Sequence, residues 1–181
     1  MLYRKKDKII LVGFMGCGKS TLGKKLARLL HYRFIDLDKY IETRTGQRIA
    51  GIFETMGEDT FRRMERECML ELLEEKHIVI ATGGGTPCYF DNMDRLLDAG
   101  CCVYIQMSEA GLFSRLRKAV QKRPLLAGKT DDALRQFIHE KLAEREPVYG
   151  RSHVVIGGIS IEAASVASVL KRKVETNPPV L

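Results

Sequence analysis

The fold is decided near the start of the chain by residues 13–21, GFMGCGKST. Their first eight residues match the phosphate-binding pattern G-x-x-x-x-G-K-[ST] without a mismatch. The short apolar run IILV at 9–12 precedes them, as a buried parallel strand requires. Leucines follow at helical spacing, at positions 22, 26, 29 and 30. The sequence therefore predicts a strand, a glycine-rich loop and a helix in direct succession.

This succession is typical of a site for the phosphates of a nucleoside triphosphate. Glycines let the backbone curl so that its N–H groups point at phosphate oxygens, and the helix N-terminus adds partial positive charge. Lys19 can then reach the β- and γ-phosphates, and the Ser20 hydroxyl can ligate Mg²⁺. The plainer alternative is a glycine turn that only starts a helix, and the full strand–loop–helix context argues against it. We therefore expect the chain to bind a nucleoside triphosphate.

The length and composition are those of one globular domain. The chain has 181 residues, of which 45% are hydrophobic. We expect a single domain over 1–175 and a frayed tail over 176–181, which contains Pro178-Pro179. No apolar stretch approaches the roughly 20 residues of a membrane span. The basic start at 1–8 resembles a signal peptide, but cleavage after the next apolar run would destroy the glycine loop, so we expect a cytoplasmic protein.

The net charge of +7 indicates anionic partners. Nucleic acid is one class, but basic and aromatic residues are not interleaved and no nucleic-acid module is recognisable. A small polyanionic substrate explains the charge equally well, and we favour it. The expected partners are thus small molecules, without nucleic acid or membrane.

The five cysteines are an odd number and form no C-x-x-C pair. Neither a disulfide framework nor a zinc site is therefore indicated, and buried free thiols are expected. Cys17 is the exception, because its place inside the glycine loop predicts an accessible thiol whose alkylation blocks nucleotide binding.

Four further strands are expected after the first, at 34–37, 78–81, 102–105 and 154–156. Helical patterns separate and follow them, at 38–45, 59–75, 92–99, 109–118, 131–146 and 161–174. Alternating strands and helices predict an α/β fold with a parallel sheet covered on both faces. Right-handed crossovers bring the carboxyl ends of all strands to one edge, where functional residues should gather.

Two carboxylates, Asp36 and Asp38, come at the end of the second expected strand. Alternate residues of a strand point the same way, so both can face one cleft, one near the metal and one near the phosphate acceptor. The alternative for Asp38 is that it only caps the following helix. The third strand carries no acid at its end, which makes Asp36 more important for the metal.

Gly83, Gly84 and Gly85 follow the third strand instead. Three glycines expose backbone N–H groups that can hold an anion, although a flexible turn is the alternative.

Three arginines are further candidates. Arg62 lies nearer than Arg63 to the buried stripe of Phe61, Met64, Cys68 and Leu72, so it can enter a cleft, although a helix arginine is more often a surface residue. Arg123 lies in a basic, glycine-containing segment typical of a mobile lid over a triphosphate. Arg145 ends a helix among glutamates, where a local ion pair is the plain alternative.

Taken together, these segments resemble the shikimate kinase family. The matching pieces keep the family's order up to about residue 156: GFMGCGKST at 13–21, FIDLD at 34–38, IFETMGEDTFRRME at 52–65, ATGGGT at 81–86, RPLL at 123–126 and EREPVY at 144–149. Each piece except the first is weak alone, but the ordered set is highly specific.

The resemblance implies a nucleoside-monophosphate-kinase-like, three-layer α/β/α fold with strand order 2-3-1-4-5, substrate-binding helices at about 38–66 and a mobile lid at about 115–130. It implies a monomer that transfers the γ-phosphoryl group of ATP to the 3-hydroxyl of shikimate in aromatic amino-acid biosynthesis. The implied ATP-binding residues are Gly16, Cys17, Gly18, Lys19, Ser20, Thr21, Arg117 (which would stack on adenine) and Arg123 (which would act from the lid).

The resemblance also implies that Ser20 and Asp36 position Mg²⁺ and that Asp38 binds the shikimate hydroxyls and accepts or orients the reacting proton. Lys19, Asp38 and Arg123 would be the catalytic residues. The shikimate site would comprise Asp38, Arg62, Arg145 and the glycines Gly83, Gly84 and Gly85, with Phe53 and Phe61 as its walls.

The chain departs from the family pattern at 157–160, GGIS, which lacks the usual Asp- and Thr-rich stretch beside adenine. A gluconate kinase is the nearest rival, and the Asp-x-Asp, FRR and RPLL pieces argue against it. A nucleotide switch would need a guanine-reading N-K-x-D, which the chain lacks. The intact Lys19, Asp38 and Arg123 argue against a catalytically silent relative.

Overall fold

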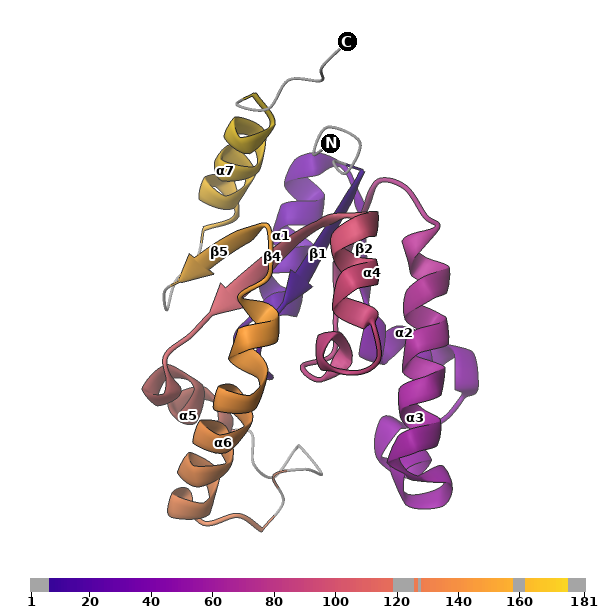
Figure 1. The fold of residues 1–181 in the computed structure, drawn as a ribbon, viewed down its shortest axis with the longest axis vertical. Coiled ribbons are helices and arrows are strands. Elements are labelled where there is room, and N and C mark those ends of the chain that lie inside the picture. The colour runs from indigo at the N-terminus through magenta and orange to yellow at the C-terminus, as the bar shows by residue number, and fades with distance from the viewer. Residues whose placement is uncertain (1–6, 119–125, 127, 158–161, 176–181) are drawn as a thin grey trace.

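A five-stranded parallel sheet forms the middle of the molecule (Figure 1). The computed structural model describes residues 7–118, 126, 128–157 and 162–175. The strand order is β2-β3-β1-β4-β5, which confirms the expected topology. The strands are β1 (Lys8–Val12), β2 (Arg33–Asp36), β3 (Ile78–Ala81), β4 (Cys101–Gln106) and β5 (Val154–Gly157).

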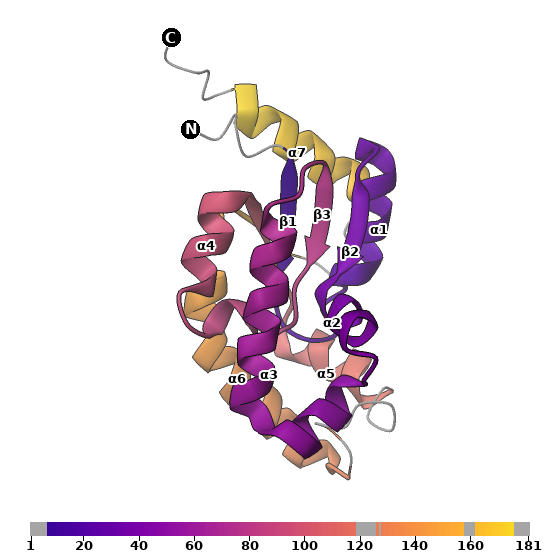
Figure 2. The ribbon, with the colours of Figure 1, turned by 90° about the vertical axis from the view of Figure 1, so that its right-hand side faces the viewer.

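Helices cover both faces of the sheet, so the three-layer expectation is confirmed as well (Figure 2). They are α1 (Lys19–Leu30), α2 (Leu37–Thr45), α3 (Ile49–Leu73), α4 (Asn92–Ala99), α5 (Glu109–Arg117), α6 (Asp131–Tyr149) and α7 (Ala163–Glu175), with a short 3₁₀ turn, η2, at Thr86–Cys88. Figure 2 shows α1 on one side of the strands and α3 and α4 on the other.

The central strand β1 shows why its sequence is apolar at every position. Ile9 and Leu11 pack into the core beneath α1 and α7, whereas Ile10 and Val12 pack into the second core beneath α3 and α4. None of the four is more than 4% exposed. A strand buried on both faces cannot alternate with polar residues.

The helix α3 begins at Ile49, well before the expected start at residue 59. Gly57 lies within it at φ 79° and ψ 170°, so α3 consists of two helical segments joined at a residue with non-helical backbone. The sequence pattern led to a wrong start because the first segment contains glycines that usually interrupt helices.

Other boundaries also differ from expectation by a few residues, and two of these differences have a clear structural reason. The helix α6 runs through Pro147 to Tyr149, and the Gly150 amide closes the added turn on the Glu146 carbonyl. The strand β2 ends at Asp36, because Leu37 already begins α2 and is fully buried.

In the part of the chain that the structure describes, no helix is long and apolar enough to cross a membrane. The expected tail at 176–181, the catalytic candidate Arg123 and most of the segment at 157–160 lie outside the described residues.

Candidate active site

The glycine loop joins β1 to α1 and has the backbone that its sequence demands. Gly16 and Gly18 have φ angles of 80° and 108°, in the region where only glycine is unstrained. The Lys19 ammonium is buried and donates to the carbonyls of Gly13 at 2.7 Å and Phe14 at 3.0 Å. The loop therefore curls around its own lysine.

A pocket of about 310 Å³ opens beside this loop. Its walls combine the loop with the ends of neighbouring strands: Met15, Gly16, Gly18, Lys19, Ser20, Thr21, Asp36, Asp38, Thr82, Gly84 and Arg115. Five of the six residues expected to bind nucleotide phosphates thus line one pocket, and the sixth, Cys17, does not.

Asp36 connects the loop to the acidic end of β2. Its Oδ2 accepts the Ser20 hydroxyl at 2.5 Å, and its Oδ1 accepts the Lys39 amide at 3.4 Å as the N-cap of α2. The capping role that was the alternative for Asp38 therefore belongs to Asp36. A hydroxyl and a carboxylate oxygen in contact are hard ligands of the kind Mg²⁺ prefers, so the pair fits that ion.

Asp38 lies in the first turn of α2 and not on the strand. The strand-alternation argument for Asp38 is thus wrong, yet both carboxylates line the first pocket, Asp36 from the N-cap of α2 and Asp38 from its first turn. The pKa of Asp38 is raised to about 6, mainly by burial of the carboxyl group and also by the nearby carboxylates of Asp36 and Glu65, while Lys19 opposes them. The side chain remains open to solvent from the cleft.

A second pocket of about 320 Å³ adjoins the first. The two share Met15, Asp38 and Gly84 in their linings. The second is also lined by Phe53, Phe61, Arg62, Gly83, Gly85 and Arg145, so every residue expected at the shikimate site lies there. The rings of Phe53 and Phe61 stand 4.6 Å apart between centroids, on the α3 side.

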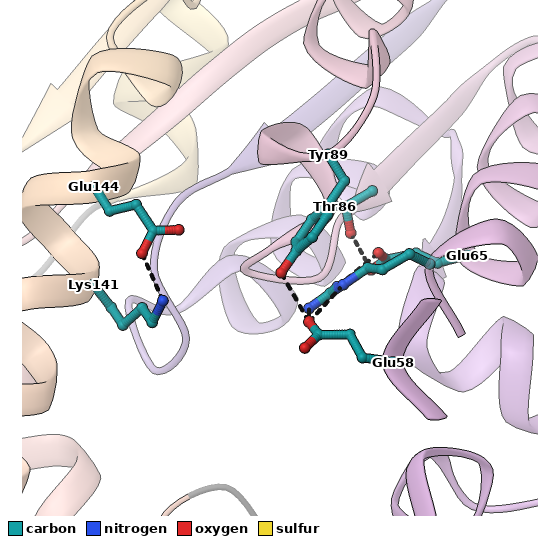
Figure 3. A network of polar contacts seen from close by, with 7 residues as sticks. Glu58, Glu65, Thr86, Tyr89, Lys141 and Glu144 are labelled. Carbon is teal, nitrogen blue, oxygen red and sulfur yellow. Dashed lines mark hydrogen bonds and ion pairs between the residues drawn. The ribbon is translucent and has the colours of Figure 1, made fainter. Parts of the chain in front are cut away.

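Arg62 enters this pocket, and the exposed Arg63 does not. The Arg62 guanidinium donates to Glu65 at 2.8 Å and to Glu58 at 3.0 and 3.2 Å. It also lies 4.0 Å from the centroid of the Tyr89 ring. Figure 3 shows Glu58, Glu65, Thr86 and Tyr89 gathered on one side, with Lys141 and Glu144 of α6 on the other.

Arg145 comes to the pocket from α6 and is only 8% exposed. Its buried Nε has no hydrogen-bond partner among the described residues. A buried N–H without a partner is costly, so Arg145 offers a donor suited to an anionic ligand.

Glycine is required at positions 83 and 85, after β3, because charged side chains lie close to the backbone there. A Cβ on Gly83 would lie 2.9 Å from the Asp38 carboxylate, and one on Gly85 would lie 3.0 Å from the Arg62 guanidinium. None of the three glycines at 83–85 has a positive φ. They leave room for the charged side chains around them.

Two buried or inward-facing charges were missed by sequence reasoning. Glu65 is 1% exposed and accepts from both Arg62 and the Thr86 hydroxyl, the latter at 2.5 Å. Arg115 lines the first pocket and donates to the carbonyls of Gly16 and Cys17. The only signal for Arg115 was the cluster of basic residues around it.

Arg117, the expected adenine-stacking residue, lines neither pocket. Its guanidinium is exposed and forms an ion pair of 2.9 Å with Asp131. Its adenine contact stays a prediction.

Cys17 is 3% exposed and belongs to the apolar core beneath α1, so the expectation of an accessible thiol is wrong. We expect iodoacetamide to modify Cys17 at least about tenfold more slowly in the native protein than in urea, because burial hides the thiolate. Peptide mass spectrometry over time gives both rates, and the half-buried Cys101 serves as the comparator. Equal rates for Cys17 in the two conditions would contradict its burial.

A triphosphate loop that shares an acidic wall with an arginine-containing pocket, on this sheet, defines a P-loop kinase of small molecules. Comparison with known proteins agrees. The family model described as shikimate kinase matches residues 15–175. The shikimate kinase of Phocaeicola vulgatus is 44% identical over 170 residues, covering 91% of this chain and 97% of its own.

Solved structures give the same result. The crystal structure of shikimate kinase from Bacteroides thetaiotaomicron superposes with a TM-score of 0.84 at 40% identity, covering 93% of this chain and 97% of its own. That of Acinetobacter baumannii in complex with shikimate gives 0.84 at 33% identity, with 96% of each chain covered. The chain belongs to the shikimate kinase family. It is accordingly a kinase that uses ATP to phosphorylate shikimate.

Proposed function

We propose that the two adjoining pockets are the two substrate sites of this reaction, with ATP in the first and shikimate in the second. One observation carries the proposal: Asp38 belongs to the lining of both pockets. Phosphoryl transfer depends mainly on placing the acceptor oxygen in line with the γ-phosphorus and on neutralising charge. A carboxylate at the shared wall is placed to hold the 3-hydroxyl of shikimate and to accept or orient its proton.

The phosphate side of the reaction would rest on the glycine loop. Lys19 would turn from its own loop carbonyls to the β- and γ-phosphates, with the amides of residues 16–21 around them. Ser20 and Asp36 would hold Mg²⁺, directly or through water, and that ion would neutralise phosphate charge. Their contact of 2.5 Å supports this pairing.

The acceptor side would recognise a carboxylate and a set of hydroxyls. Arg62, Arg145 and the backbone near Gly84 would bind the carboxylate, since guanidinium groups and amides are strong donors to it. Phe53 and Phe61 would wall the ring. The unpartnered Nε of Arg145 supports the anion assignment.

The remaining roles stay proposals that rest on the family resemblance. They are a lid at about 115–130 from which Arg123 reaches the transferring phosphoryl group, and contact of Arg117 with adenine. We also propose one domain over 1–175 acting as a monomer in the cytoplasm, with no nucleic-acid or membrane partner.

The test of acceptor and cofactor is an ADP-release assay. We expect ADP formation to require both Mg²⁺ and shikimate, and to stay near background with gluconate, with a nucleoside monophosphate or without an acceptor. Chelation by EDTA should abolish turnover and added Mg²⁺ should restore it. Equal rates with and without shikimate would contradict the acceptor, and full activity in EDTA would contradict the ion.

A further inference from the structure

The guanidinium of Arg62 is in contact with two carboxylates, although it carries only one positive charge. It contacts Glu58 through Nε and Nη2 and Glu65 through Nη1. A substrate carboxylate would be the third anion on this guanidinium. Like charges this close oppose one another strongly in a partly dehydrated site, so one of the present carboxylates has to give way.

The two carboxylates differ in how firmly they are held. Glu65 is 1% exposed, and its second oxygen accepts the Thr86 hydroxyl. The Glu58 side chain is 52% exposed, and its other contact is with the Tyr89 hydroxyl at 2.8 Å. Glu58 can return to water at little cost, whereas Glu65 would have to leave the protein interior.

The backbone supports the same distinction. Glu58 directly follows Gly57, the residue at which α3 departs from helical geometry. It therefore begins the second helical segment, while Glu65 lies two turns further inside it.

We propose that Glu58 holds, in the free enzyme, the place on Arg62 that the carboxylate of shikimate takes, and so acts as an internal competitor that sets the affinity for the acceptor. This rests on the assignment of the second pocket to shikimate. In the free enzyme the competitor keeps the buried guanidinium paired. When shikimate binds, Glu58 exchanges its hydrogen bonds with Arg62 for hydrogen bonds with water. The carboxylate of shikimate then takes its place on Arg62 and also contacts Arg145.

The decisive variant is Glu58→Gln, which keeps the shape of the side chain and removes its charge. Because the amide carries no negative charge, it loses the Coulombic attraction to the Arg62 guanidinium and should compete less. We expect KM and Kd for shikimate to fall by about 3- to 10-fold, with kcat within about twofold. The methyl ester of shikimate does not compete for Arg62 as an anion, so its Kd should stay unchanged.

The matched control is Glu54→Gln, on the exposed part of the same helix, which removes the same charge outside the pocket linings. It should leave KM and Kd unchanged. Steady-state kinetics and calorimetric titration of both variants give the comparison. A higher KM in Glu58→Gln would show that Glu58 positions Arg62, and an unchanged KM would show no competition; either result overturns the proposal, as does an equal gain for the ester.

The variant Arg62→Gln separates this proposal from the assignment of the pocket. If it raises KM for shikimate while Glu58→Gln fails to lower it, the pocket assignment stands and only the competition is wrong. If Arg62→Gln leaves KM unchanged, the assignment of Arg62 to the acceptor carboxylate fails. A circular dichroism spectrum and a melting temperature for each variant establish that it is folded.

Discussion

The variant Asp38→Asn is expected to lower kcat by about 10²- to 10⁴-fold while the Kd for ATP stays within about twofold. Asp38 lines both pockets, and its carboxylate is the acceptor we propose for the reacting hydroxyl. The amide has nearly the same shape but cannot take a proton. Initial rates of ADP formation and a titration with a fluorescent ATP analogue measure the two quantities.

The variant Asp132→Asn is a suitable control, since Asp132 is exposed in the first turn of α6 and lines neither pocket. It should keep the rate of the natural chain. If Asp38→Asn retained more than about a tenth of the natural kcat, Asp38 would have no part in proton transfer.

The variant Asp38→Asn should also be more stable than the natural chain in the absence of nucleotide and Mg²⁺. The pKa of Asp38 is raised to about 6 in the folded state, so the folded protein binds a proton more tightly than the unfolded chain does. Its free energy of unfolding therefore falls as the pH rises from about 4 to about 6 and stays lowered above that. Water in the open pocket screens this electrostatic effect. We therefore expect the free energy of unfolding of Asp38→Asn to exceed that of the natural chain by about 1 kcal/mol at pH 7.5.

Urea denaturation in EDTA at about pH 4 and pH 7.5 measures this gain. It should be large at pH 7.5 and small at pH 4, where the natural carboxylate is itself protonated in the fold. A variant less stable than the natural chain at pH 7.5 would contradict the raised pKa.

The variant Lys19→Met is expected to lower kcat/KM by about 10³-fold or more. The lysine stem is buried in the loop, and methionine replaces its apolar part while removing the charge. In the free enzyme the variant also loses the hydrogen bonds from Lys19 to the carbonyls of Gly13 and Phe14. We expect the effect of that loss on activity to be small compared with the loss of a positive charge at the phosphates.

Lys24→Met is the matched control, because Lys24 is an exposed residue on the same helix α1. It should leave kcat/KM within about twofold of the natural value. If both lysine variants lost activity equally, the effect would lie in the helix and not at the phosphates.

Much of the fold was predictable because it depends on local patterns. The apolar run of β1, the glycine loop and the strand–helix alternation each involve neighbouring residues, and the resemblance supplied the strand order. The predicted boundaries were wrong for the helices in which tertiary packing outweighs the helix propensity of the residues. The first part of α3 forms although it contains Gly51 and Gly57, and α6 continues through Pro147.

The site residues that belong to sequence motifs were predictable, whereas those placed by contacts between distant parts of the chain were not. Arg115 and Arg117 are two residues apart, so they point about 200° away from each other on α5. Which of them faces the glycine loop depends on the rotation of α5 relative to that loop, and no local sequence pattern shows it. Glu65 is hidden for the same reason: its partner Thr86 lies on the far side of β3 in the sequence.

The central place of β1 has a consequence for how the protein is made. Ile9 pairs with Val79 on one side and with Cys101 on the other, and neither neighbour is close to it in the chain. Because β1 is synthesised before β3 and β4, it can pair on both sides only after both of these strands have been made. The two neighbours of β1 are therefore both present only once β4 has been synthesised, although β2 and β3 can pair with each other before that.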